Sequence, residues 1–435
     1  MMKNNSAVSV FWFRRDLRLT DNIALYHALN DTHPTLPLFI FDESITSKLP
    51  KNDPRINFIY ETLEVLSESL SQYNSSILIK KGNVLEIWES LLDEFNIQSV
   101  YFNEDFEPSA IERDNLVATL LEKEKITLHL YKDQVVFAKD EVLKNDNTPY
   151  SVFTPFKKRW LMRLVDNPIE TQPLNMNLKK MIPAHFPFPK LSDIGFAKST
   201  IKVRPYNINQ LDNYNKTRDY PALNQTSDLA PHLRFGTVSI REVLRKTMHH
   251  EVFVSELIWR EFYMQILYHY PDVVTHNFKR KYDGIRWRNN HEEFELWKNG
   301  LTGYPMVDAG MRELKETGYM HNRVRMITAG FLCKHLLIDW KWGEAYFASQ
   351  LLDYELSSNN GNWQWAAGTG CDSAPYFRIF NPTEQVKKFD SEKQYIQKWV
   401  PEINSLDYPM PIVEHKFARE RALITYKEGL LLYTD

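Results

Sequence analysis

Residues 8–18 read Val-Ser-Val-Phe-Trp-Phe-Arg-Arg-Asp-Leu-Arg, an apolar run that ends in charged side chains. Its β-branched and aromatic residues favour a buried strand. Similar runs follow at residues 36–41, 77–80, 99–102 and 126–131, and amphipathic stretches such as 55–70 and 109–121 lie between them. The order βαβαβαβαβ predicts a doubly wound parallel sheet with helices on both faces. The glycine-rich dinucleotide fingerprint is absent after the first strand, so this domain need not hold a dinucleotide in the usual way.

The rest of the chain has a different character. Seven prolines between Pro149 and Pro189 indicate a long ordered connection. After about residue 200 strand signals nearly vanish, and stretches such as 252–270 and 305–338 have apolar residues at helical spacing. We therefore predict an α/β domain at 1–138, a linker at 139–200 and an all-α domain at 201–435.

Composition limits the classes of function. The 435 residues are 43% hydrophobic and 25% charged, and no apolar run is long enough for a membrane span. Residues 1–9 do not resemble a secretory signal, so we expect a soluble cytoplasmic protein without a membrane partner. The two cysteines, Cys333 and Cys371, lack metal-ligand spacing, and we expect core thiols and no metal.

A basic segment stands out at residues 277–288, with five basic side chains against one acid and three interleaved aromatics. This pattern is typical of a nucleic-acid groove, where cations neutralise phosphates and rings stack on bases. A solvated basic loop is the alternative, and it is favoured when this segment is taken alone. The net charge of −3 favours neither reading.

Tryptophan is concentrated in the second half, where eight of the eleven lie between Trp259 and Trp399. A helical core would account for them, but polar neighbours suggest more. On a helix, Glu256 and Trp259 share a face, which suits holding a base by stacking and a hydrogen bond. Asn322 and Met326 share another face. Residues 353–382 pack amides, indoles and small residues closely in sequence, and amides can meet a heterocycle without changing its charge.

These motifs resemble the photolyase and cryptochrome family over essentially the whole chain, most closely the class I cyclobutane pyrimidine dimer photolyases. The most specific matches are Trp259-Arg260-Glu261-Phe262, Gly303-Tyr304-Pro305, Met320-His321-Asn322-Arg323 and residues 359–382. The resemblance implies an α/β domain followed by an all-helical FAD-binding domain. It implies a DNA photolyase, a carbon–carbon lyase in which light-driven electron transfer from reduced FAD splits cyclobutane pyrimidine dimers.

The resemblance also implies a flavin site. An ion pair of Arg325 and Asp353 stands beside the isoalloxazine ring, and Asn359 faces its N5. The other implied FAD contacts are Glu355, the acid paired with Asp353 in the motif, and Tyr214, Thr226, Ser227, Asp228, Leu229 and Ala230, where family members often have serine in place of Ala230. Electron hopping to the surface would use Trp363, Trp340 and Trp287.

The lesion pocket implied by the resemblance consists of Arg218, Glu256, Trp259, Asn322, Arg323, Met326 and Trp365. Glu256 would hydrogen-bond the flipped dimer, and Trp259 and Trp365 would bracket it. A dimer stacks poorly, so flipping it costs less than flipping a normal base. Photolyases for the (6-4) photoproduct usually have a histidine at the position of Met326, and methionine cannot transfer a proton.

Three alternatives remain. A cryptochrome-type blue-light receptor would signal instead of repairing DNA, a (6-4) photolyase would take another lesion, and an ordinary flavin oxidoreductase lacks any nicotinamide signature here. Many family members also bind an antenna chromophore, methenyltetrahydrofolate or a deazaflavin, and Asn103 lies where folate types contact it. A strand-end loop explains Asn103 as well. We expect ultraviolet-damaged DNA as the partner and a monomer.

Overall fold

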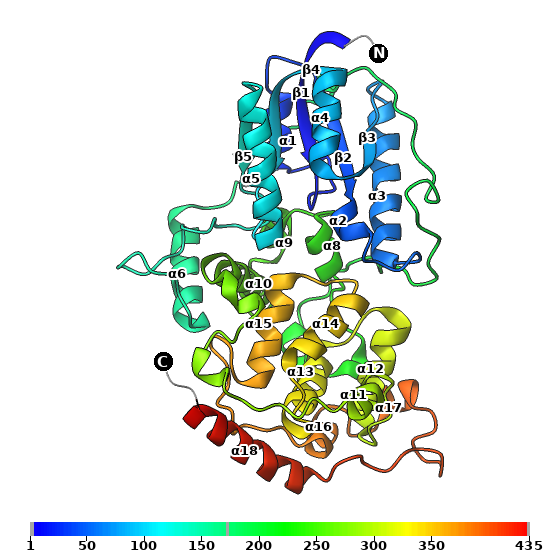
Figure 1. Ribbon diagram of the computed structural model, residues 1–435, viewed down its shortest axis with the longest axis vertical. Coiled ribbons are helices and arrows are strands. Elements are labelled where there is room, and N and C mark those ends of the chain that lie inside the picture. Colours follow the sequence, from blue (N-terminus) through cyan, green and yellow to red (C-terminus); the bar gives the residue numbers. More distant parts are fainter. Residues whose placement is uncertain (1–3, 171–173, 433–435) are drawn as a thin grey trace. The chain divides into compact units, whose positions relative to one another are not determined.

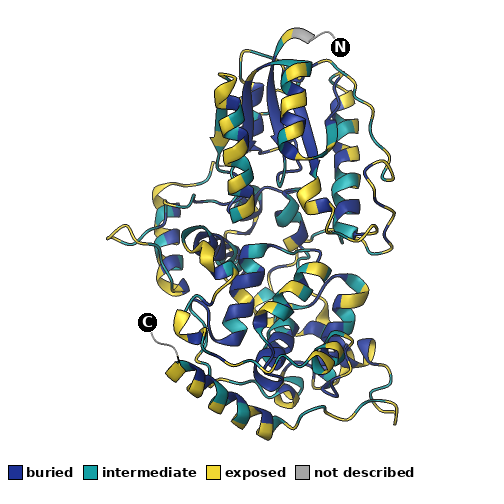
Figure 2. Cartoon of the chain, viewed as in Figure 1, coloured by how far each residue is buried: buried dark blue, intermediate teal, exposed yellow. Residues whose placement is uncertain are grey.

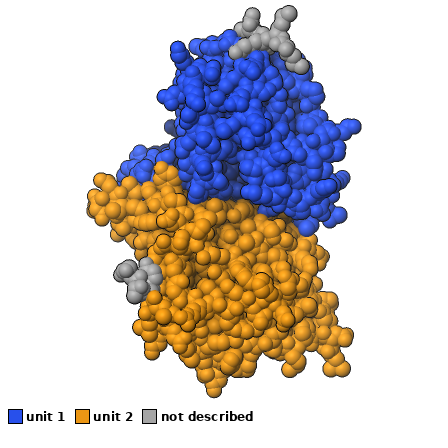
Figure 3. Space-filling model, viewed as in Figure 1, with its two compact units in different colours: residues 1–142, 159–208, 228–249 blue, residues 143–158, 209–227, 250–435 orange. Residues whose placement is uncertain are grey.

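The computed structural model describes residues 4–170 and 174–432. The chain forms two compact units (Figure 3), one of residues 1–142, 159–208 and 228–249, the other of residues 143–158, 209–227 and 250–435. Each unit therefore takes segments from several places in the sequence. The contiguous domain boundaries at 138 and 200 stay a prediction.

The first unit contains a five-stranded sheet of order β3-β2-β1-β4-β5 in which every neighbouring pair is parallel (Figure 1). All five predicted strands and both named helices are present. The strands are β1 (Asn4–Phe13), β2 (Thr35–Asp42), β3 (Leu78–Gly82), β4 (Phe95–Asn103) and β5 (Thr127–Tyr131). The helices and turns are α1 (Ile23–Leu29), α2 (Glu43–Thr46), α3 (Pro54–Ser71), α4 (Val84–Glu94), α5 (Pro108–Lys123), η1 (Leu178–Lys180), α8 (Ala230–Phe235) and α9 (Ile240–Thr247).

Alternation along β1 explains why helices cover both faces of the sheet. Phe11 and Phe13 pack into one core with α1 and α3, whereas Val10 and Trp12 pack into another with α4 and α5. Successive side chains of a strand point to opposite faces, so a strand that is apolar throughout is buried twice. Figure 2 shows the central strands β1, β2 and β4 largely buried, whereas the edge strands β3 and β5 are mostly half-buried or exposed.

The second unit is helical, as predicted. Its elements are α7 (Tyr214–Thr217), η2 (Pro221–Leu223), α10 (Glu251–His269), η3 (Pro271–Val274), η4 (Arg280–Tyr282), α11 (His291–Lys298), α12 (Pro305–Thr317), α13 (Asn322–Gly330), η5 (Phe331–His335), α14 (Trp340–Gln350), α15 (Leu356–Ala367), α16 (Pro382–Phe389), α17 (Gln394–Trp399) and α18 (His415–Leu432). The predicted helical stretch 305–338 is interrupted at Gly318, whose φ of 72° ends α12. Both cysteines are buried free thiols.

The proline-rich connection contains a helix that the sequence reading overlooked, α6 (Phe153–Asp166). Pro155 lies in its first turn, where a missing N–H costs little. Phe156, Trp160 and Leu164 recur at helical spacing and are buried. Among the described residues, no helix is long and apolar enough to cross a membrane.

Candidate active site

Three helices of the second unit carry many of the predicted site residues. Glu256 and Trp259 lie on α10, Asn322 to Met326 begin α13, and Asn359 to Trp365 lie on α15. The helices α10 and α15 approach closely at Gly361, where a Cβ atom would lie 2.1 Å from the Tyr263 ring. Glycine is therefore required at this crossing.

Asn359 is buried, and its amide is held by a residue that the sequence did not single out. Nδ2 donates to the Glu344 backbone oxygen at 3.1 Å and to Glu344 Oε1 at 2.8 Å. Burial raises the pKa of Glu344, and the hydrogen bond from Asn359 opposes that rise. No sequence motif marks Glu344, because the contact joins α14 to α15 through the fold.

The ion pair expected between Arg325 and Asp353 is present. Arg325 Nη2 lies 2.9 Å from Asp353 Oδ2, and Arg325 Nε donates to the Met320 carbonyl at 2.8 Å. The second carboxylate oxygen, Asp353 Oδ1, is buried without a hydrogen-bond partner. A buried acceptor of this kind normally meets a donor, so this position suits a ligand with an N–H group.

Glu355, the other acid of the motif, is turned to a different partner. It is buried, and Oε2 lies 3.2 Å from Nε of Arg260 on α10. The Arg260 of the Trp-Arg-Glu-Phe motif thus ties α10 to the start of α15. This role was not predicted.

Glu256 forms an ion pair with Arg218, whose Nη1 lies 2.7 Å from Glu256 Oε1. The Arg218 guanidinium lies 5.4 Å from the centre of the Tyr214 ring. Burial, followed by the charge of Glu256, raises the pKa of the Tyr214 hydroxyl to about 12. These three predicted residues therefore form one group, and Arg218 neutralises the acid expected to meet the dimer.

Trp259 lies face to face with Phe153, with ring centres 3.6 Å apart and planes 7° apart. Trp365 instead lines a pocket with Met326. Trp259 is not part of that pocket lining. Bracketing of a dimer by Trp259 and Trp365 stays a prediction.

The first turn of α13 presents Asn322 exposed and Arg323 half-buried. Arg323 Nη2 lies 2.7 Å from Asp219 Oδ1, and its guanidinium lies 4.4 Å from the Phe389 ring centre. His321 caps the helix by accepting from the Arg323 N–H at 3.1 Å. Burial lowers the pKa of His321 to about 4, so the cap is neutral at ordinary pH.

The three predicted electron-hopping indoles share one core. Trp340 and Trp363 belong to it, and Trp287 packs against it while remaining half-exposed. Trp340 Nε1 donates to Asn277 Oδ1 at 2.9 Å. Burial thus decreases from Trp363 and Trp340 to Trp287, as a path toward solvent requires.

The predicted phosphate loop ends at a helix start, as expected. Ala230 is the first residue of α8, and Leu229 precedes it. Thr226 is exposed and Ser227 half-buried in the second unit. Asp228 has a φ of 49° and forms an ion pair with Arg204 at 3.6 Å in the first unit.

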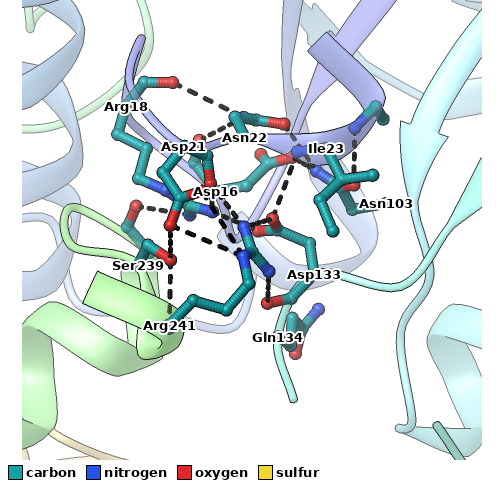
Figure 4. A network of polar contacts seen from close by, with 12 residues as sticks. Asp16, Arg18, Asp21, Asn22, Ile23, Asn103, Asp133, Gln134, Ser239 and Arg241 are labelled. Atoms are coloured by element: carbon teal, nitrogen blue, oxygen red, sulfur yellow. Dashed lines mark hydrogen bonds and ion pairs between the residues drawn. The ribbon is translucent and has the colours of Figure 1, made fainter. Parts of the chain in front are cut away.

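Asn103 belongs to a buried polar network of the first unit (Figure 4). Nδ2 donates to Asp16 Oδ2 at 2.5 Å and to Asn22 Oδ1 at 2.9 Å, while Oδ1 accepts from the Ala24 N–H at 3.1 Å. This side chain is committed to holding β4 against the loop before α1. A chromophore contact through the Asn103 amide would require breaking that network.

The same network explains the charged sequence after β1. Arg18 and Arg241 flank Asp133, at 2.5 and 2.8 Å. Burial would raise the pKa of Asp133, but the two arginines lower it. Ser239 Oγ donates to Asp21 Oδ2 at 2.6 Å. These charges link the loop after β1 to α9. Among the described residues, no group of three or more acids, histidines or cysteines could hold a metal ion.

The fold and site define a protein with a doubly wound sheet and a helical unit rich in polar and aromatic groups suited to a flavin. A family model described as DNA photolyase matches residues 9–174, and one described as the FAD binding domain of DNA photolyase matches residues 253–407. The chain belongs to the DNA photolyase family, a family of FAD-binding enzymes that act on damaged DNA. The predicted family, fold class and cofactor FAD are confirmed.

Curated relatives match the chain nearly end to end. The deoxyribodipyrimidine photo-lyase of Escherichia coli is 36% identical over 96% of this chain and 98% of its own length. The enzyme of the same name from Halobacterium salinarum is 33% identical over 97% of this chain and 99% of its own.

Solved structures agree. A bacterial class III photolyase from Agrobacterium tumefaciens has a TM-score of 0.87 and 32% identity, with 98% of each chain covered. An archaeal photolyase from Sulfolobus tokodaii, described with two FAD molecules, has a TM-score of 0.85 and 34% identity, with 97% of this chain and 99% of that one covered. The predicted closeness to class I stays a prediction.

Proposed function

We propose that this protein is a light-driven deoxyribodipyrimidine photolyase that splits cyclobutane pyrimidine dimers in ultraviolet-damaged DNA. The observation that carries the proposal is the near-complete match to enzymes of that name, combined with a pocket lined by Met326 and Trp365. The Met326 side chain provides an apolar surface and cannot donate a proton to the lesion. This favours the cyclobutane lesion over the (6-4) photoproduct, whose repair uses general acid chemistry.

The residues of the second unit fit FAD. Asp353 Oδ1 is a buried acceptor without a partner, and Arg325 provides a fixed positive charge beside it. Asn359 presents a neutral amide that Glu344 orients. Tyr214, Thr226, Ser227 and Glu355 would complete the contacts from the second unit, and the contacts expected at residues 228–230 stay a prediction.

The chemistry supplied by bound, reduced FAD is the light-driven donation of one electron and its later recovery. The chain's own residues supply position and electrostatics. Arg325 would balance negative charge beside Asp353, and Asn359 would set the polarity at the flavin edge. Electrons from an external reductant would reach the flavin through Trp287, Trp340 and Trp363 and restore its reduced form.

On the lesion side, Glu256 would accept a hydrogen bond from the dimer and Arg218 would hold that carboxylate in place at 2.7 Å. Trp259, stacked on Phe153, provides a rigid wall, and Trp365 provides another. Asn322 and Arg323 would meet the adjoining base edge and phosphate. Selectivity would come from the low cost of flipping out a dimer that stacks poorly.

A cryptochrome-type receptor is the second candidate, since a cryptochrome from Synechocystis is also a structural neighbour, with a TM-score of 0.85, 25% identity and coverage of 98% of this chain and 100% of that one. We favour repair because the predicted lesion residues are retained. We further propose a monomeric cytoplasmic enzyme, with an antenna chromophore that does not depend on the Asn103 amide.

The test compares two lesions. Photoreduced protein is mixed with oligonucleotides that carry either a single thymine cyclobutane dimer or a single (6-4) photoproduct, and each is illuminated. Restoration of the dimer substrate alone supports the proposal. Repair of the (6-4) substrate alone would move the chain to the alternative enzyme, and repair of neither would favour a receptor.

A further inference from the structure

Lys334 is a buried lysine outside the residues considered so far. It lies in the π-helical segment η5 and is 2% exposed. Nζ donates to the Ala367 carbonyl at 2.6 Å and to the Tyr376 carbonyl at 3.3 Å, and it lies 3.7 Å from the centre of the Tyr426 ring. In the described part of the chain, the Lys334 ammonium group thus contacts two backbone carbonyls and one aromatic ring.

A charge in this position is costly. Burial lowers the pKa of Lys334 to about 7, which reflects the price of removing an ammonium group from water. An apolar side chain of similar volume would usually stabilise such a core at least as well. A lysine here therefore suggests a use beyond filling space, and π-turns in helices are frequent at functional sites.

The two carbonyls belong to two segments that both line one pocket. Ala367 ends α15, which carries Trp365, and Tyr376 lies in the loop that carries Arg378. Lys334 itself lines this pocket together with Met326, Trp365, Gly368 and Arg378. Its ammonium group therefore ties together two segments of the pocket lining.

The turn between these segments is tight. Gly368 has a φ of 82°, and a Cβ atom there would lie 3.2 Å from both Lys334 Nζ and Tyr376 Cα. The chain can pass so close only without a side chain at this position. Lys334 completes the turn by hydrogen bonds that the backbone does not supply.

We propose that Lys334 is a positioning residue for DNA-lesion binding, which clamps the loop around Tyr376 to the end of α15 and so sets the places of Trp365 and Arg378. This inference rests on the proposed function, because the ligand proposed for this pocket is the flipped dimer. Tyr426 also donates to the Ala367 carbonyl, at 2.8 Å. Loss of the lysine therefore frees the loop more than it frees α15.

The test variant is Lys334→Met, which keeps the apolar stem and removes the donor. We measure its Kd in the dark for oligonucleotides with and without one thymine dimer, and kcat and KM for repair in light. Loss of the hydrogen bonds from Lys334 Nζ predicts about tenfold weaker dimer binding and a matching rise in KM. kcat should stay within about twofold, since the cofactor contacts are elsewhere.

Three comparisons make the result decisive. Lys398→Met, at an exposed lysine of the same unit, should leave the dimer Kd unchanged. Lys334→Gln retains an uncharged N–H donor group on a shorter side chain and should fall between wild type and Lys334→Met. If Lys334→Met does not fold, the Gln variant decides, with a dimer Kd equal to wild type counting against the proposal.

Two outcomes would overturn the role of Lys334 alone: unchanged dimer discrimination in Lys334→Met, or a parallel loss of kcat, FAD and Tm that indicates a general structural role. If wild-type protein itself neither prefers dimer-containing DNA nor repairs it in light, the proposed function fails instead.

Discussion

Asn359 Nδ2 lies 2.8 Å from Glu344 Oε1 and 3.1 Å from the Glu344 carbonyl oxygen, so both amide hydrogens are directed to one residue. The amide orientation is thereby fixed, and Oδ1 is the atom left to meet a ligand. An oxygen can only accept a hydrogen bond. Glu344 thus determines that Asn359 would present its oxygen to a flavin bound as predicted.

Replacing Asn359 with alanine should destabilise the protein and impair repair. The Glu344 carboxyl would stay buried without its partner, at a cost of about 1–2 kcal/mol in the free energy of unfolding. Urea unfolding and repair assays check this. Asn362→Ala, at an exposed asparagine of the same helix, is the control. Equal stability of the two variants would contradict the account.

Replacing Arg325 with methionine should weaken FAD binding. The buried Asp353 would lose its ion pair while Oδ1 already lacks a partner, which predicts at least about tenfold weaker affinity. Titration of apoprotein with FAD, followed by fluorescence, measures it. Arg312→Met breaks a comparable ion pair with Glu402 and should leave FAD affinity within about twofold. A similar loss in both would indicate a general effect of ion-pair removal.

His321 should make stability depend on acid pH. Its folded pKa of about 4 lies below its usual 6.5, because burial disfavours the charged ring. Between these values the unfolded chain binds more protons, so the His321 contribution is present above pH 6.5 and is lost as the pH falls toward 4. The expected loss is about 3 kcal/mol. His321→Asn keeps a capping side chain without a titrating ring.

The measurement is the free energy of urea unfolding at several pH values in both proteins. Wild type should lose more stability than His321→Asn over this interval, while the two agree in slope above pH 7. Parallel curves throughout would show that other groups carry the acid sensitivity.

Trp340→Phe should slow reduction of the flavin by light and external reductant, to under about a tenth of the wild-type rate, if electrons hop through this indole. Repair by chemically reduced protein should be unchanged. Trp297→Phe is the matched control, since Trp297 is equally buried in the same core and also donates from Nε1, to the Thr328 carbonyl at 3.2 Å. Similar slowing in both variants would assign the effect to packing.

The sequence was sufficient for much of the fold. The continuous apolar run of β1 predicts burial on both faces, and the five strands appear where expected. The helix α6 was missed because the prolines of the surrounding connection suggested an irregular segment, although Phe156, Trp160 and Leu164 already had helical spacing. The spacing of apolar residues along the sequence depends on local structure, so helices and strands can be predicted from one sequence.

The site was less accessible to sequence reasoning. The pair of Arg325 and Asp353 followed from family motifs, but the partners Glu344 and Phe153 carry no motif, and the motif that contains Arg260 did not predict its contact with Glu355. Each contact joins elements separated along the chain, such as α6 and α10 in the stacking of Phe153 on Trp259. Such contacts depend on tertiary packing. For Asn103, the sequence predicted the position at the end of β4. It did not predict the hydrogen bond from the side chain to Asp16.

The central claim is that light converts bound dimer to intact pyrimidines. The most direct measurement follows thymine-dimer loss by chromatography in a mixture of chemically reduced protein and dimer-containing DNA, with matched samples in blue light and darkness and with Glu256→Gln alongside. The account predicts repair in light only, reduced about fivefold in the variant by loss of one charge-assisted hydrogen bond. Undiminished dimer in light, with reduced FAD bound to wild-type protein, would contradict it.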